Sequence, residues 1–209
     1  MRSMLMKYNL VFSKGYEVRY ISHLDLMRTF ERALRRSDLP LQYSAGFNPR
    51  IKMSFALPLP VSIEGELELA SLELSAHISP ETIKSKLNQA LPTGISIIKC
   101  FLDIESSSLS TQITAAAYVA YYRDEVDGSY LNSMLSQNTL IYQKKSKKKT
   151  REIDLKEYLY HCSFSPESIN FEVKAGNEIN IRPNEVLSLL QPNIVPTRII
   201  RKKLYTDHA

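Results

Sequence analysis

Four arginines lie within nine residues, at a spacing that would gather them on one side of a helix. They are Arg28, Arg32, Arg35 and Arg36. Because an α-helix turns by about 100° per residue, side chains at i, i+4, i+7 and i+8 share one face. A guanidinium group binds a phosphate through two parallel hydrogen bonds and also stacks on bases. The alternative is a solvated face on which Asp25 and Glu31 pair with the arginines three or four residues further on.

The segment after this helix combines aromatic and basic side chains. Its candidate binding residues are Tyr43, Phe47, Asn48, Arg50 and Lys52. Aromatic rings stack on unpaired bases while neighbouring cations hold phosphates, so the mixture is typical of single-stranded nucleic-acid binding. The alternative is that Phe47 fills the core and that Asn48-Pro49 only shapes a turn.

A third candidate is a run of eight residues that contains six cations. The cations are Lys144, Lys145, Lys147, Lys148, Lys149 and Arg151. Repulsion between like charges favours an extended conformation. Such a run could clamp a phosphate backbone, or it could be the solvated tip of a hairpin.

Groups suited to catalysis or metal binding are sparse. His23 is a weak candidate for a general base beside Asp25, although a surface histidine next to a capping residue is the plainer interpretation. The two cysteines, Cys100 and Cys162, form no C-x-x-C motif, and the sequence contains no H-x-x-x-H, phosphate loop, G-x-G-x-x-G or G-x-S-x-G. We therefore expect no autonomous activity and no metal or cofactor in this chain.

The composition is that of a folded protein with unevenly distributed charge. Of the 209 residues, 44% are hydrophobic and 23% are charged. No apolar run approaches the roughly 20 residues of a membrane span, and no secretory signal is recognised, so we expect a cytoplasmic protein without a membrane partner. The net charge is +6 over residues 1–52, −6 over 53–139, +6 over 140–151 and −1 over 152–209. The two basic blocks favour a polyanionic partner if folding brings them together.

The elements that must position these residues follow a recognisable order in the first half. The patterns predict strands at residues 7–13, 50–55, 64–73 and 95–102, and helices from Ser22 to about Ser37 and from Ser79 to before Pro92. Strand, helix, strand, strand, helix, strand is the split βαβ order of a ferredoxin-like fold. The first predicted domain covers residues 1–105, with polar residues 106–110 as a linker.

The second half, residues 111–209, repeats this rhythm with additions. The patterns predict strands at 115–122, 139–145 and 198–205, helices at 129–136 and 182–190, and a hairpin that joins 168–173 to 178–181. We interpret it as a second, decorated α+β domain, with a ferredoxin-like order as one interpretation. In its last strand, Arg201 and Lys203 are predicted to share one face.

Five segments resemble a known bacterial family. They are residues 20–28 (YISHLDLMR), 32–36 (RALRR), 43–49 (YSxGFNP), 151–154 (REID) and 181–187 (IRPxxVL). On these motifs the chain resembles the radical-SAM-associated protein family, an uncharacterised bacterial domain found beside or fused to the C-terminus of a B12-binding-type radical SAM protein. The resemblance implies an accessory protein whose radical SAM partner carries the 4Fe-4S cluster and S-adenosylmethionine. It supplies no catalytic residue to carry over.

Three hypotheses follow. The leading one is a non-catalytic module that binds or presents RNA to a radical SAM enzyme through the arginine helix, the aromatic loop and the lysine run. The second is a protein–protein adaptor that docks onto the radical SAM partner. The third is a metal-independent endoribonuclease with His23 as general base.

Overall fold

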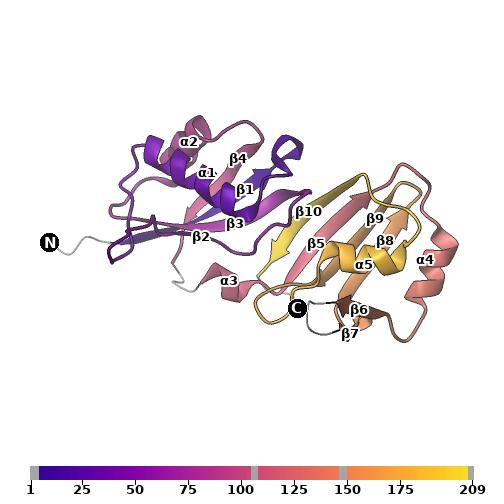
Figure 1. Cartoon of the computed structure of the whole chain (residues 1–209). Helices are drawn as coiled ribbons and strands as arrows, with labels where there is room; N and C mark the ends of the chain where they lie inside the picture. Colours follow the sequence, from indigo (N-terminus) through magenta and orange to yellow (C-terminus); the bar gives the residue numbers. More distant parts are fainter. Residues whose placement is uncertain (1–4, 105–107, 146–149, 207–209) are drawn as a thin grey trace. The chain divides into compact units, whose positions relative to one another are not determined.

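The computed structural model describes residues 5–104, 108–145 and 150–206, and it divides the chain into two compact units, residues 1–113 and 114–209 (Figure 1). Each unit builds its core between an antiparallel sheet and helices, and each is described by itself. Among the described residues, no helix combines the length and apolar character that crossing a membrane requires.

The first unit has the ferredoxin-like order that the sequence predicts. Its elements are β1 (Met6–Lys14), a 3-10 turn (Tyr16–Val18), α1 (His23–Arg36), β2 (Met53–Phe55), β3 (Ile63–Leu74), α2 (Pro80–Ala90), β4 (Ile95–Leu102) and α3 (Leu109–Gln112). The strands pair antiparallel in the order β4-β1-β3-β2. Each βαβ crossover therefore skips one strand, which is the split arrangement of this fold.

Helix α1 begins where the sequence places it, and its apolar side fills the core. The Ser22 Oγ accepts a hydrogen bond from the Asp25 backbone N–H at 3.2 Å, which satisfies one of the free donors of the first turn. Leu26, Phe30 and Leu34 are buried, and the Phe30 ring lies 5.1 Å from that of Phe12 in β1. This packing fixes the rotation of the helix, so the arginine side must face outward.

The second unit repeats the same order around an inserted hairpin. Its elements are β5 (Ala115–Tyr121), α4 (Gly128–Leu135), β6 (Ile141–Lys145), β7 (Thr150–Asp154), a 3-10 turn (Leu155–Glu157), β8 (Leu159–Ser165), β9 (Ser168–Lys174), α5 (Pro183–Leu190) and β10 (Arg198–Tyr205). The main strands pair antiparallel in the order β10-β5-β9-β8, while β6 pairs with β7. Without this hairpin the order is again ferredoxin-like, so the interpretation as a decorated α+β domain is confirmed.

One hairpin was paired wrongly from the sequence. Strand β9 pairs with β8 through the turn at Pro166-Glu167, and residues 178–181 form no strand. Among the backbone hydrogen bonds of the described residues, one joins residues 178–181 to β9. In it the Ile181 N–H donates to the Lys174 carbonyl at 3.2 Å. Most side chains of β8 are exposed, so this strand lacks the apolar alternation by which a strand is recognised.

The prediction that Arg201 and Lys203 share a face is also wrong. Arg201 lies opposite Tyr118 and Lys203 opposite Ala117, because the register shifts between them. Neighbours on a strand point to opposite faces, so the two cations do as well. The bulge buries Arg201, which is 1% exposed, and leaves Lys203 outside.

Candidate nucleic-acid interface

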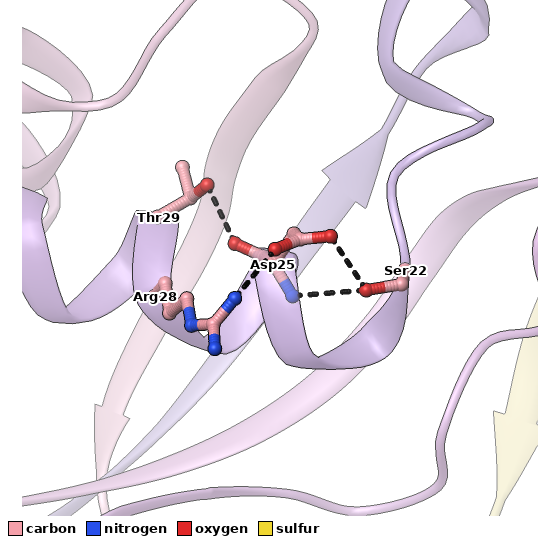
Figure 2. Close-up of polar contacts among 4 residues, drawn as sticks. All are labelled: Ser22, Asp25, Arg28 and Thr29. Carbon is pink, nitrogen blue, oxygen red and sulfur yellow. Dashed lines mark hydrogen bonds and ion pairs between the residues drawn. The ribbon is translucent and has the colours of Figure 1, made fainter.

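The outer side of α1 presents all four predicted arginines to solvent. Arg28 is paired, since its guanidinium lies 3.1 Å from the Asp25 carboxylate (Figure 2). Asp25 also accepts a hydrogen bond from the Ser22 hydroxyl at 2.7 Å. The hydrogen bonds from Ser22 and Arg28 lower the pKa of Asp25 below its ordinary value. The first turn of α1 is therefore a closed polar network that holds Arg28 in place.

The other three arginines have no carboxylate partner among the described residues. Arg36 donates instead to the Ala90 carbonyl at the end of α2, at 2.6 Å. Arg32 and Arg35 make no ion pair within the described chain, and the pair expected between Glu31 and the arginine four residues later is not formed. Positive charge on this face is therefore left uncompensated toward the C-terminal half of the helix.

The loop after α1 is closed at its base and exposed at its tip. Ser44 and Arg50 bond across it: the Ser44 backbone N–H donates to the Arg50 carbonyl at 2.8 Å, and the Arg50 N–H donates to the Ser44 hydroxyl at 3.0 Å. Gly46 takes a positive φ of 119°, which favours glycine. At the tip Phe47 is fully exposed, so it does not fill the core, and Asn48 and Arg50 nearby are exposed as well.

The helix and the loop meet at one hollow in the first unit. This open hollow of about 460 Å³ is lined by Leu34, Arg35, Asp38, Leu39, Leu41 and Tyr43. Arg35 and Tyr43, which are candidates from separate segments, thus border the same space. The charge of Lys52 is already compensated, because its ammonium pairs with Glu73 in β3 at 2.9 Å.

The His23 ring packs against an aromatic side chain of β2. Its ring meets the Phe55 ring edge-on at 5.6 Å, and its Nδ1 is buried without a hydrogen-bond partner among the described residues. Burial lowers the pKa of His23, which keeps the ring neutral at neutral pH. Within the described chain no group of three or more His, Cys, Asp or Glu side chains could hold a metal ion.

The lysine run belongs to the second unit. Lys144 pairs with the buried Glu185 of α5 at 2.8 Å, and on the opposite strand Arg151 is exposed. The predicted binding residues Lys147, Lys148 and Lys149 lie outside the described residues, as does the side chain of Lys145. Lys144 is therefore compensated, and Arg151 is the exposed cation of the run that the structure describes.

The structure also reveals an aromatic cluster that was not predicted. Arg19 lies over two tyrosine rings, 3.4 Å from the centre of Tyr16 and 4.4 Å from the centre of Tyr20. The two tyrosines are 53% and 65% exposed. The sequence YEVRY contains a signal for this cluster, since two aromatics flank an arginine within five residues. We refer to Tyr16, Arg19 and Tyr20 as the tyrosine–arginine cluster.

Comparisons with known proteins connect the chain to one family and show a similarity of fold to solved structures, including two crystal structures. The family described as "Uncharacterized protein conserved in bacteria (DUF2344)" matches residues 7–183. The fold is similar to a crystal structure of a Cbf5-Nop10-Gar1 complex, at 12% identity and a TM-score of 0.49, over 95% of this chain and 48% of that chain. It is also similar to a crystal structure of the archaeal box H/ACA sRNP Nop10-Cbf5 complex, at 12% identity and a TM-score of 0.45, over 98% of this chain and 49% of that chain. The chain thus spans about half the length of these chains, and no curated protein matches it.

Proposed function

Since the chain belongs to the DUF2344 family of proteins conserved in bacteria, its function has to be inferred from its own surface, and we propose that it binds single-stranded RNA without reacting with it. One observation carries this proposal. The exposed guanidinium groups of Arg32 and Arg35 have no carboxylate partner in the described chain, and the adjoining loop holds the Phe47 ring fully in solvent. Cations bind phosphates and an exposed ring stacks on bases, so the two features complement a single strand.

The individual residues would take different roles. Arg32, Arg35 and Arg50 would hold phosphates, while Tyr43 and Phe47 would stack on bases. Arg28 and Arg36 are oriented by their contacts with Asp25 and Ala90 and keep further N–H donors for a ligand. Together these residues would give the RNA strand a path along α1 and across the loop. In the second unit, the exposed Arg151 of the lysine run would hold a phosphate by itself.

We further propose, from the resemblance of its motifs, that the protein presents RNA to a radical SAM enzyme. That partner would supply the 4Fe-4S cluster and S-adenosylmethionine, and no residue of this chain takes part in that chemistry. The sequence supports this division, because it contains two cysteines, Cys100 and Cys162, whereas a 4Fe-4S cluster is held by a larger set of cysteine thiolates.

Binding of a labelled oligouridine at increasing salt tests the proposal. We expect the affinity of the wild-type protein to fall steeply with salt, because bound phosphates release counterions. The variant Arg32→Ala/Arg35→Ala should bind about tenfold or more weakly and show a shallower salt dependence. The control Lys99→Ala/Arg123→Ala removes two exposed cations outside this face and should bind like the wild type. Absence of binding at low salt, or equal loss in both variants, would contradict the proposal.

The exposed Phe47 also favours the adaptor hypothesis, because a fully exposed ring at a loop tip can anchor a protein partner. Co-purification of the radical SAM partner after nuclease treatment separates the two functions. If Phe47→Ala abolishes a nuclease-resistant complex and leaves RNA affinity intact, Phe47 anchors a protein partner and does not stack on bases. If the complex disappears with the RNA, the adaptor function is excluded.

A further inference from the structure

We infer that the tyrosine–arginine cluster is a second base-stacking site, and that it and the 43–52 loop hold two ends of one single-stranded RNA along α1. This inference rests on the proposed RNA binding and adds to it a second site, a path along α1 and a minimum ligand length. It uses Tyr16, Arg19 and Tyr20, which precede α1, whereas the loop follows it.

The cluster has the composition of a stacking site. The Arg19 guanidinium lies over the rings of Tyr16 and Tyr20, and it donates to the Tyr16 carbonyl at 2.7 Å and the Tyr20 hydroxyl at 3.3 Å. It has no carboxylate partner among the described residues, so its charge is available to a phosphate. Both rings are more than half exposed, which leaves ring surface for a base.

The backbone of the turn that carries the cluster is held by hydrogen bonds from other segments of the first unit. The Lys14 ammonium, which is 1% exposed, donates to the Arg19 carbonyl at 2.9 Å and to the Ile21 carbonyl at 3.3 Å. The Ser62 backbone N–H also donates to the Arg19 carbonyl, at 2.9 Å. At the start of the turn, the Gly15 N–H donates to the Gly94 carbonyl at 2.7 Å. The rings are therefore presented on an ordered turn, which reduces the entropy that binding must overcome.

Helix α1 connects the cluster to the loop. Leu24, Arg28 and Arg32 follow one another at intervals of four residues, and all three are exposed. Arg35 continues this face and borders the hollow that Tyr43 also lines. The 14 residues of α1 span about 20 Å at 1.5 Å per residue. At about 3.4 Å per stacked nucleotide this distance corresponds to about six nucleotides, and fewer if the strand is extended.

Oligouridines of three and nine nucleotides test the inference, because only the longer one can reach both ends. We expect the wild type to bind the nonamer more tightly than the trimer. Tyr16→Ala/Tyr20→Ala should weaken nonamer binding about tenfold or more and reduce this difference. The control Tyr121→Ala/Tyr160→Ala removes two exposed tyrosines of the second unit and should bind like the wild type. Since the chain has no Trp, tyrosine emission gives a second readout, and RNA should quench it less in the Tyr16/Tyr20 variant.

The outcomes separate this inference from the proposed function. If Tyr16→Ala/Tyr20→Ala binds the nonamer like the wild type while Arg32→Ala/Arg35→Ala does not, RNA binding stands and the second stacking site is overturned. If the wild type binds no RNA, both are overturned. If the tyrosine variant loses only a protein complex, the cluster is a protein-docking site and the inference is also overturned.

Discussion

The ammonium group of Lys52 lies 2.9 Å from the carboxylate of Glu73, and the Glu73 backbone N–H donates to the Lys52 carbonyl at the same distance. Two residues 21 positions apart are thus joined through both side chain and backbone. The pairing neutralises a lysine that sequence alone assigns to RNA. Its neighbour Arg50 is exposed and has no carboxylate partner in the described chain.

We therefore expect Arg50→Ala to weaken oligouridine binding severalfold and Lys52→Ala to change it little. An exposed cation without a partner contributes its full charge to a phosphate, whereas the Lys52 charge is already compensated. Titration of both variants at the same low salt checks this. A larger loss from Lys52→Ala than from Arg50→Ala would show that RNA displaces Glu73.

Lys144→Ala should lower the stability of the second unit rather than its affinity for RNA. Lys144 pairs with Glu185, whose side chain is 7% exposed and also accepts from the Arg182 backbone N–H at 3.0 Å. Removing the cation leaves a buried charge unpaired, which costs about 1–3 kcal/mol. Urea denaturation measures the loss. Arg151→Ala, on the exposed facing position, is the matched control and should stay within about 0.5 kcal/mol of the wild type.

Ser22→Ala should destabilise α1 and change the acid response of the first unit. Loss of an N-cap hydroxyl costs about 1 kcal/mol. Hydrogen bonds from Ser22 and Arg28 lower the pKa of Asp25. Its contribution to the free energy of unfolding is therefore complete above the unfolded pKa near 3.8, and it is lost as the pH falls through the lower folded pKa. The difference in urea midpoint between the wild type and Asp25→Asn should therefore be smaller at pH 3 than at pH 7. Equal differences at both pH values would contradict this.

Neither cysteine should react readily in the folded protein. Burial raises the pKa of Cys100 to about 12 and that of Cys162 to about 11, so the nucleophilic thiolate is scarce at pH 8. We expect alkylation by iodoacetamide to be far slower than that of glutathione under the same conditions and to become fast in urea. Fast labelling of the native protein, followed by mass spectrometry, would contradict the burial of these thiols.

Local signals in the sequence predicted most of the fold. The Ser22 and Ser79 caps start α1 and α2 as expected, and the strand at Ile95–Leu102 has the predicted bounds. The failures have physical causes. Strand β8 exposes most of its side chains. The bulge after Arg201 changes the face to which the following side chains point, although the residue pattern stays the same. Neither feature leaves a periodic trace in the sequence.

The candidate interface was less predictable because charge compensation acts over long distances. Spacing alone indicates the Asp25–Arg28 pair, which the structure confirms. It cannot indicate that Glu73 reaches Lys52 or that Glu185 reaches Lys144, since these pairs depend on strand register and on helix docking. The tyrosine–arginine cluster is local, and the sequence YEVRY carries its signal. The sequence does not show that the buried Lys14 ammonium holds the turn that presents the two rings.

Strands β6 and β7 pair with each other, and the principal sheet of the second unit runs β10-β5-β9-β8 without them. The hairpin is nevertheless tied to the unit by its side chains, because Lys144 of β6 pairs with the buried Glu185 of α5 (Figure 1). A substitution at the exposed Arg151 leaves this ion pair in place, whereas a shortening that removes Lys144 must also replace the partner of Glu185.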